Sequence, residues 1–140
     1  MNYGHKKTQD NFMQLGKRLG YAVRRSWSRD LPTDGVWLID CPLSLDGQIP
    51  FVAAEVLASE KGKVILGSLA TLERVNPAIA LVIIADDEYR RRLYKKGMGV
   101  EDVEVAVANF VEKVRAAVSG RIQRFKVCTA SGLERRFVNV

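Results

Sequence analysis

The stretch PTDGVWLIDCPLSLDGQIPFVAAEVLASEKGK, residues 32–63, gives the clearest signal of how this chain folds. Its segments GVWLIDC and FVAAEVL are rich in strand-forming residues, and the Asp46-Gly47 pair between them is a turn signal, so the stretch predicts an antiparallel hairpin. Side chains alternate across a strand, so Glu55 shares its face with apolar neighbours. Counting back from the turn places Asp34 at the same end of the hairpin as Glu55.

These two carboxylates need an explanation because burying a carboxylate is unfavourable unless it is paired or binds a cation. Asp34 and Glu55 at one end of adjacent strands form a hard-oxygen site of the kind that Mg²⁺ uses, with water and substrate phosphate as further ligands. The alternative is that Asp34 is only a turn residue in PTDG and that Glu55 pairs with a lysine. Spacing alone leaves both interpretations open.

On both sides of the hairpin, hydrophobic periodicity predicts helices and strands. A positively charged end and the following glycine are typical of helix C-termini, and Gly20 and Gly97 fit that role. The 100–118 segment is the clearest helix, with a valine-rich stripe from Val100 to Val118. The expected elements are a helix at 10–20, strands at 21–27, 35–41 and 51–57, a helix at 62–75, a strand at 77–85, helices at 86–97 and 100–118, and a strand at 124–130.

The composition is that of an ordinary soluble domain, with 140 residues and 47% hydrophobic side chains, so we expect a single domain covering 1–140. No apolar run is long enough for a membrane span, and the N-terminus lacks the apolar core of a secretory signal. Cys41 and Cys128 are far apart and form no zinc motif. His5 is the single histidine, which argues against His-dependent hydrolysis. We therefore expect a cytoplasmic protein with no membrane partner.

The net charge of +6 is unevenly distributed. Residues 1–29 carry seven Lys or Arg against one Asp, and residues 121–140 carry five against one Glu, whereas the middle of the chain has more acids than bases. Two basic ends around an acidic middle suit a polyanionic partner with an acidic site between them. A charge distribution that only favours solubility is the alternative.

At this point the residues resemble a known family. The order of elements, the segment PTDGVWLI and the segment FVAAEV resemble the PD-(D/E)xK nuclease superfamily, and DNFMQLGKRLGYAVRR is similar to the first helix and strand of archaeal Holliday-junction resolvases. The resemblance covers roughly residues 8–85. It implies an α/β fold with an αβββαβ restriction-endonuclease-like core, a central mixed sheet flanked by helices, and a C-terminal helical extension.

By this resemblance Asp34 and Glu55 would hold Mg²⁺ or Mn²⁺, and Asp10 would be an auxiliary first-helix residue, with Gln9 or Gln14 as alternatives. One position departs from the family pattern: Leu57 stands where the family has the lysine that orients the attacking water. Some members supply this lysine from the following helix. Lys63 is our preferred substitute and Lys61 the second, and the alternative for each is a solvated loop lysine.

The resemblance implies a DNA endonuclease that hydrolyses phosphodiester bonds through an Asp/Glu-bound Mg²⁺ ion and acts as a homodimer, because one small chain cuts one strand. A catalytically inactive nucleic-acid-binding relative is the alternative. A third interpretation is an oligomeric structural protein that uses the 100–118 helix at an interface. The residues expected to contact the DNA backbone are Lys6, Lys7, Lys17, Arg18, Arg24 and Arg25.

Overall fold

The structure, a computed structural model, describes residues 3–121 and 124–138. Ten elements follow one another along these residues. They are α1 (Tyr3–Arg18), β1 (Ala22–Arg24), β2 (Gly35–Asp40), β3 (Gln48–Leu57), α2 (Gly62–Val75), β4 (Ile79–Ile84), α3 (Asp86–Lys95), α4 (Val100–Val118), β5 (Phe125–Thr129) and α5 (Ala130–Val138).

The strands form one mixed sheet in the order β1-β2-β3-β4-β5. The first three strands pair antiparallel, and β4 and β5 then add in parallel. An α/β fold with a central mixed sheet flanked by helices is therefore confirmed, and the αβββαβ order of the first six elements agrees with the expectation. Whether this core is restriction-endonuclease-like stays a prediction.

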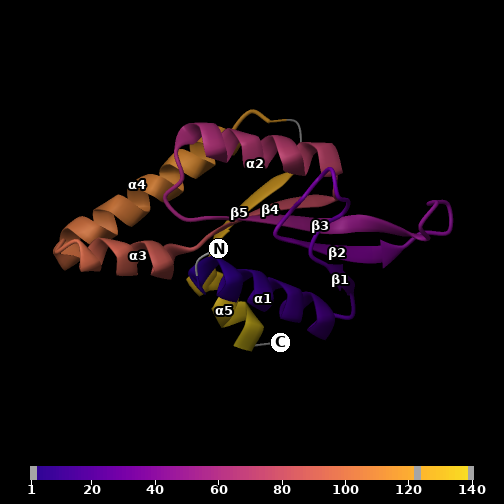
Figure 1. Ribbon diagram of the computed structural model, residues 1–140, viewed down its shortest axis with the longest axis horizontal. Helices are drawn as coiled ribbons and strands as arrows, with labels where there is room; N and C mark the ends of the chain where they lie inside the picture. Colours follow the sequence, from indigo (N-terminus) through magenta and orange to yellow (C-terminus); the bar gives the residue numbers. More distant parts are fainter. Residues whose placement is uncertain (1–2, 122–123, 139–140) are drawn as a thin grey trace.

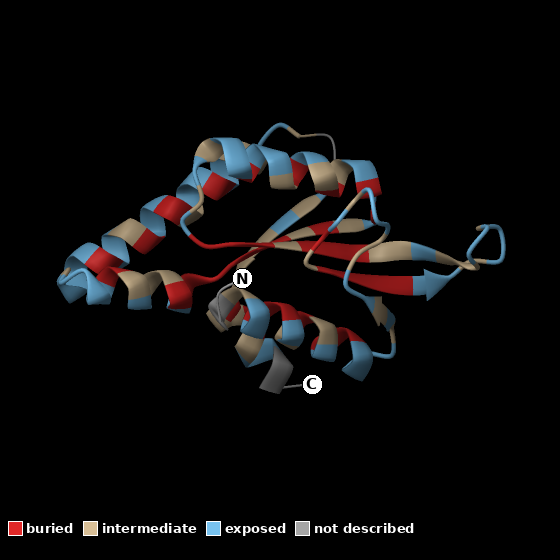
Figure 2. Ribbon diagram, in the orientation of Figure 1, coloured by how far each residue is buried: buried red, intermediate tan, exposed pale blue. Residues whose placement is uncertain are grey.

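Helices cover both faces of the sheet (Figure 1). On one face α2 and α4 pack over a core that includes Leu57, Leu69 and Phe110. On the other face α1 and α5 pack over a second core that includes Phe12 and Leu133. Figure 2 shows the buried residues of the helices turned toward the sheet. Both sides of the central strands are thus covered, which explains why the β4 sequence is apolar at every position.

Helix α1 approaches the sheet closely at one glycine. A side chain at Gly16 would meet Trp37, because a Cβ atom there would lie 2.4 Å from the indole Nε1. Trp37 stacks between Phe12 and Tyr21, with ring centroids 4.7 Å and 5.4 Å away, and its indole donates a 3.0 Å hydrogen bond to the Phe12 carbonyl. This packing fixes α1 across β2, next to the start of that strand.

Two details of the expected elements differ in the structure, and one helix was not expected. The hairpin turns at the Asp46-Gly47 signal through a longer loop: residues 41–47 connect β2 to β3, and Gly47, at φ +74°, is the last of them. Val100 is 66% exposed, since α4 turns its first residue away from the core. Helix α5 was not anticipated, because its sequence ASGLERRFV is short and contains a glycine. Within the described ranges, no helix is long and apolar enough to cross a bilayer.

Candidate metal and phosphate site

The two carboxylates singled out from the sequence lie side by side in the structure. The register of the hairpin pairs Gly35 with Ala54, so the next position on each strand brings Asp34 opposite Glu55. The Asp34 amide donates to the Ala54 carbonyl at 3.0 Å, and Asp34 Oδ2 accepts from the Val56 amide at 2.7 Å. These backbone contacts fix the Asp34 carboxylate against the strand that carries Glu55.

The electrostatics of this pair are strongly perturbed. Burial, the hydrogen bond with the Asp34 carboxyl and the negative charge of Asp34, in that order of importance, together raise the pKa of Glu55 to about 9. Two hydrogen-bonded carboxyls cannot both ionise easily without a compensating charge. Glu55 therefore keeps a proton at neutral pH in the absence of a cation, and a divalent ion bound by both residues would replace that proton.

A buried glutamine orients the Asp34 carboxylate. Gln9 is only 2% exposed, and its Nε2 donates to Asp34 Oδ1 at 2.5 Å, while its Oε1 accepts a hydrogen bond from Arg25. The first-helix residue in contact with the pair is thus Gln9, the alternative to the expected Asp10. Asp10 is exposed and lines the hollow beside Asp34 without contacting the pair through any hydrogen bond in the described residues.

An open cavity of about 310 Å³ lies directly beside Asp34. Lys17 comes to it from α1 and Arg25 from the segment after β1, so two cations face the same space as Asp34, whereas Glu55 does not line the cavity. A phosphate group in this cavity would meet the positive charge of Lys17 and Arg25 as well as the Asp34 carboxylate. A cation bound at Asp34 would neutralise the repulsion between phosphate and carboxylate. The lining residues are Gln9, Asp10, Met13, Gln14, Lys17, Arg25 and Asp34.

Neither of the two candidate lysines, Lys61 and Lys63, contacts the Asp34–Glu55 pair in the described residues. Lys61 is the N-cap residue of α2 and Lys63 lies in its first turn, and both are exposed. Neither forms a hydrogen bond or ion pair with Asp34 or Glu55 in the described part of the chain. Leu57, at the position of the motif lysine, is 1% exposed and belongs to the core under α2. Leu57 is therefore part of the core packing in this structure.

The donor chemistry of the pair fits a hard divalent cation. In residues 3–121 and 124–138 no group of three or more His, Cys, Asp or Glu side chains could hold a metal ion. A cation at Asp34 and Glu55 would have two protein carboxylates and would complete its shell with water and phosphate oxygens. Mg²⁺ is commonly bound in this way, whereas Zn²⁺ sites use more protein ligands.

His5 contacts two glutamates next to the carboxyl pair, and the sequence did not predict this cluster. His5 Nε2 lies 3.2 Å from the Val56 carbonyl and 3.4 Å from Glu60, and Nδ1 lies 3.3 Å from Glu88. The Glu60 hydrogen bond chiefly raises the pKa of His5, with burial opposing it and the Glu88 charge adding to it. The His5 ring thus ties α1 to the end of β3 and to α3. No periodic signal marks a lone histidine, so only the tertiary structure reveals this contact.

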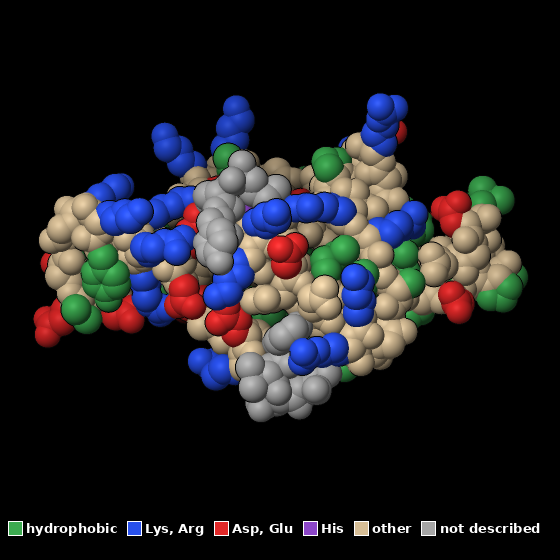
Figure 3. Space-filling model, turned by 60° about the horizontal axis from the view of Figure 1, so that its bottom comes forward, with side chains coloured by type: hydrophobic (Ala, Val, Ile, Leu, Met, Phe, Trp, Pro, Cys, Tyr) green, Lys and Arg blue, Asp and Glu red, His purple; other side chains and the backbone are tan. Residues whose placement is uncertain are grey.

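The basic residues expected to contact DNA are all exposed, and Lys and Arg side chains spread across the α1 side of the molecule (Figure 3). Lys6 and Lys7 line a second open hollow with Asp10 and Asn11. Lys7 also lies 3.1 Å from Glu134, an exposed ion pair that contributes little to stability. The set comprises Lys6, Lys7, Lys17 and Arg18 of α1, Arg24 at the end of β1, and Arg25 directly after it.

Comparison of the chain with family models, with curated proteins and with solved structures finds no match.

Proposed function

We propose that the protein is a DNA endonuclease that uses Mg²⁺ or Mn²⁺ to hydrolyse a phosphodiester bond, with the restriction-endonuclease-like core that its sequence resembles. The observation that carries the proposal is the Asp34–Glu55 pair, with the pKa of Glu55 raised to about 9, and the cavity that Asp34 lines together with Lys17 and Arg25. A purely structural role does not need two adjacent carboxyls of which one borders open space.

Each residue has a distinct task in this reaction. Asp34 and Glu55 bind the cation, and Gln9 holds the Asp34 carboxylate in place through its 2.5 Å hydrogen bond. Lys17 and Arg25 bind the phosphate that is to be cleaved or its neighbours. The cation, when bound, supplies an activated water and neutralises charge on the phosphate. Lys63, with Lys61 as second choice, assists the attacking water only if its long side chain turns back toward Glu55.

The test is nicking of supercoiled plasmid DNA by the purified chain with Mg²⁺ or Mn²⁺. We expect Glu55→Gln to abolish nicking, whereas Glu112→Gln, which changes an exposed carboxylate on α4, leaves it unchanged. The glutamine retains the size of the side chain, so lost activity is not explained by a cavity. Nicking by Glu55→Gln at the rate of the wild type would refute the site. Lys63→Ala and Lys61→Ala then show which lysine takes part.

The catalytically inactive DNA-binding relative is supported by a separate observation. Leu57 is fully packed in the core, and Lys61 and Lys63 are both exposed. A binder without catalysis would show a steep loss of DNA affinity with salt and no nicking with either cation. Lys17→Glu would weaken the DNA affinity of such a binder, and added Mg²⁺ would not raise its melting temperature. A rise in melting temperature with Mg²⁺ that Glu55→Gln abolishes favours the nuclease.

A further inference from the structure

The loop between β2 and β3 presents two leucines entirely to water. Leu43 is 97% and Leu45 107% exposed, whereas the next most exposed large hydrophobic residue in the described chain, Val100, is 66% exposed. The loop extends from one end of the molecule, beyond the helices (Figure 1). Single exposed leucines are common on surfaces, but two at the tip of one projecting loop are typical of a contact with another protein.

The loop has a defined shape. The Cys41 amide donates to the Gly47 carbonyl at 2.8 Å, the Ser44 amide donates to the Cys41 carbonyl at 3.0 Å, and the Ser44 hydroxyl donates to the Gln48 carbonyl at 2.9 Å. These hydrogen bonds close the loop on itself and hold Leu43 and Leu45 outward. A preorganised loop loses little conformational entropy when it binds, so its apolar tip is suited to insertion into a partner.

The charge around the leucines excludes an acidic partner. Residues 30–60 contain six Asp or Glu and no Lys or Arg, in a chain whose net charge is +6. Asp46 directly follows Leu45 in the loop and Asp40 ends β2 just before it. Figure 3 shows acidic and hydrophobic side chains together at this end of the molecule. DNA and anionic membranes would repel such a tip. Its partner should offer an apolar hollow with a basic rim.

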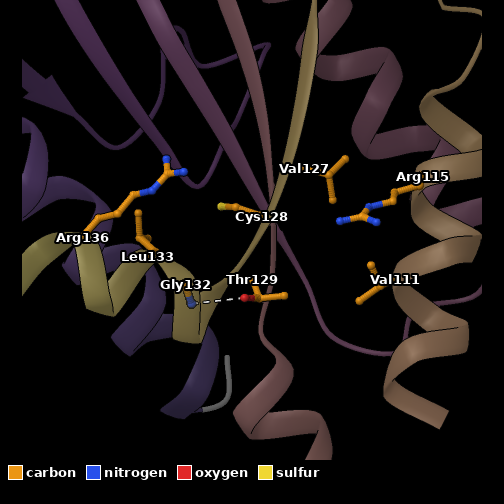
Figure 4. A pocket seen from close by; sticks show the side chains of 8 residues that line it. All are labelled: Val111, Arg115, Val127, Cys128, Thr129, Gly132, Leu133 and Arg136. Atoms are coloured by element: carbon orange, nitrogen blue, oxygen red, sulfur yellow. Dashed lines mark hydrogen bonds between the residues drawn. The ribbon is translucent and has the colours of Figure 1, made fainter. Parts of the chain in front are cut away.

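The chain itself has a hollow of this kind at the free edge of the sheet. A cavity of about 230 Å³ opens between α4 and α5 along β5, which pairs with β4 on its other side. Figure 4 shows Val127, Val111 and Arg115 on one side of β5, and Cys128, Leu133 and Arg136 on the other.

The hollow combines apolar walls with positive charge from Arg115 and Arg136. The described lining includes no carboxylate, and Arg115 is 59% exposed with only a 3.4 Å contact to the exposed Glu112. An apolar cavity of ~150 Å³ already accepts a benzene-sized group, so this one has room for a leucine side chain.

We propose that the 41–47 loop of one copy of this chain docks into the β5 hollow of a second copy, with its leucines against Val111, Val127 and Leu133 and its aspartates toward Arg115 and Arg136. When each of two copies inserts its loop into the other, the result is a closed dimer with a two-fold axis, whereas a one-sided contact would continue as an open chain of subunits. Direct β5-to-β5 pairing is disfavoured, because it would bring these arginines against their own copies. The contact gives an arrangement for the homodimer that the sequence resemblance implies, and it does not depend on any chemistry at Asp34 and Glu55.

The two cysteines provide a direct test because one lies in each half of the contact. Cys41 begins the loop and Cys128 lines the hollow, and both thiols are free. A short bismaleimide should therefore link Cys41 of one copy to Cys128 of another. We expect the cross-linked dimer to disappear in Cys41→Ser and in Cys128→Ser alike, and to return when the two variants are mixed, since the mixture restores one Cys41–Cys128 pair. A cross-link that survives either single variant would overturn this arrangement.

The mass in solution provides the second test, by analytical ultracentrifugation of the full chain. We expect a dimer whose dissociation constant rises about tenfold or more for the Leu43→Ser/Leu45→Ser variant, which changes only exposed residues. The matched control is Val64→Ser/Leu66→Ser on α2, where exposed apolar residues outside the proposed contact are changed and the dimer should persist.

Charge reversal distinguishes a specific contact from general stickiness. Arg115→Glu/Arg136→Glu should give monomers, and mixing this variant with Asp40→Arg/Asp46→Arg should restore dimers, because the reversed charges again attract. A wild-type chain that stays monomeric, or a dimer that none of these variants weakens, refutes the proposal. A monomer that nicks DNA would refute only this interface, and an inactive dimer would refute only the nuclease.

Discussion

Replacing Glu55 by glutamine gives a sharp test of the carboxyl pair, because the substitution removes a titrating group and keeps its shape. In the folded chain, burial and the neighbouring Asp34 raise the pKa of Glu55 to about 9, whereas an unfolded glutamate titrates near the ordinary value of 4.5. Between these values the folded state holds a proton that the unfolded state has lost. Stability should therefore fall as the pH rises through this window.

The size of the effect follows from proton linkage. One extra proton bound in the folded state lowers the free energy of unfolding by ~1.4 kcal/mol for each pH unit. From pH 6 to pH 8 the upper limit is therefore ~2.7 kcal/mol, and partial solvation of the pair reduces it to about 2 kcal/mol. Glu55→Gln cannot lose a proton, so it should lack this decline and should be more stable than the wild type at pH 8.

The assay is urea unfolding followed by circular dichroism at several pH values, with a chelator present. His5 also has a raised pKa and adds to the decline in both proteins, so the difference in slope between wild type and variant isolates Glu55. The Glu112→Gln variant, which changes an exposed carboxylate, should keep the wild-type slope of unfolding free energy against pH. Equal slopes for wild type and Glu55→Gln would refute the raised pKa. Added Mg²⁺ should reduce the wild-type decline, because the cation replaces the proton.

Two predictions concern the packing that holds the site. Gly16→Ala should destabilise the fold by ~1–3 kcal/mol, since its Cβ would lie 2.4 Å from Trp37, whereas Gly67→Ala on α2 meets nothing within 4 Å and should be neutral or stabilising by ~0.5–1 kcal/mol in thermal unfolding. Leu69→Ala should cost ~2–5 kcal/mol because Leu69 is fully buried, and Leu66→Ala on the exposed side of the same helix should stay within ~0.5 kcal/mol. Equal effects within either pair of variants would contradict the packing described for α1 or α2.

Local patterns in the sequence were sufficient for most of the fold. The strand pairing of the hairpin, the helices at 62–75 and 100–118, and the buried central strand at 79–84 follow from periodicity and turn residues, which act over a few neighbours. The adjacency of Asp34 and Glu55 also followed, because an antiparallel register fixes which residues face one another. The sequence likewise located the buried face that Glu55 shares with Ala53 and Leu57.

Contacts between segments far apart in the chain were decided only by the tertiary structure. Gln9 rather than Asp10 holds Asp34, because the rotation of α1 is set by Trp37 packing against Gly16. Neither Lys61 nor Lys63 reaches the pair, and the hollow along β5 exists only because α4 and α5 pack on opposite sides of an edge strand. Sequence patterns encode which side of an element is buried, but the partner of each side depends on how all the elements pack together.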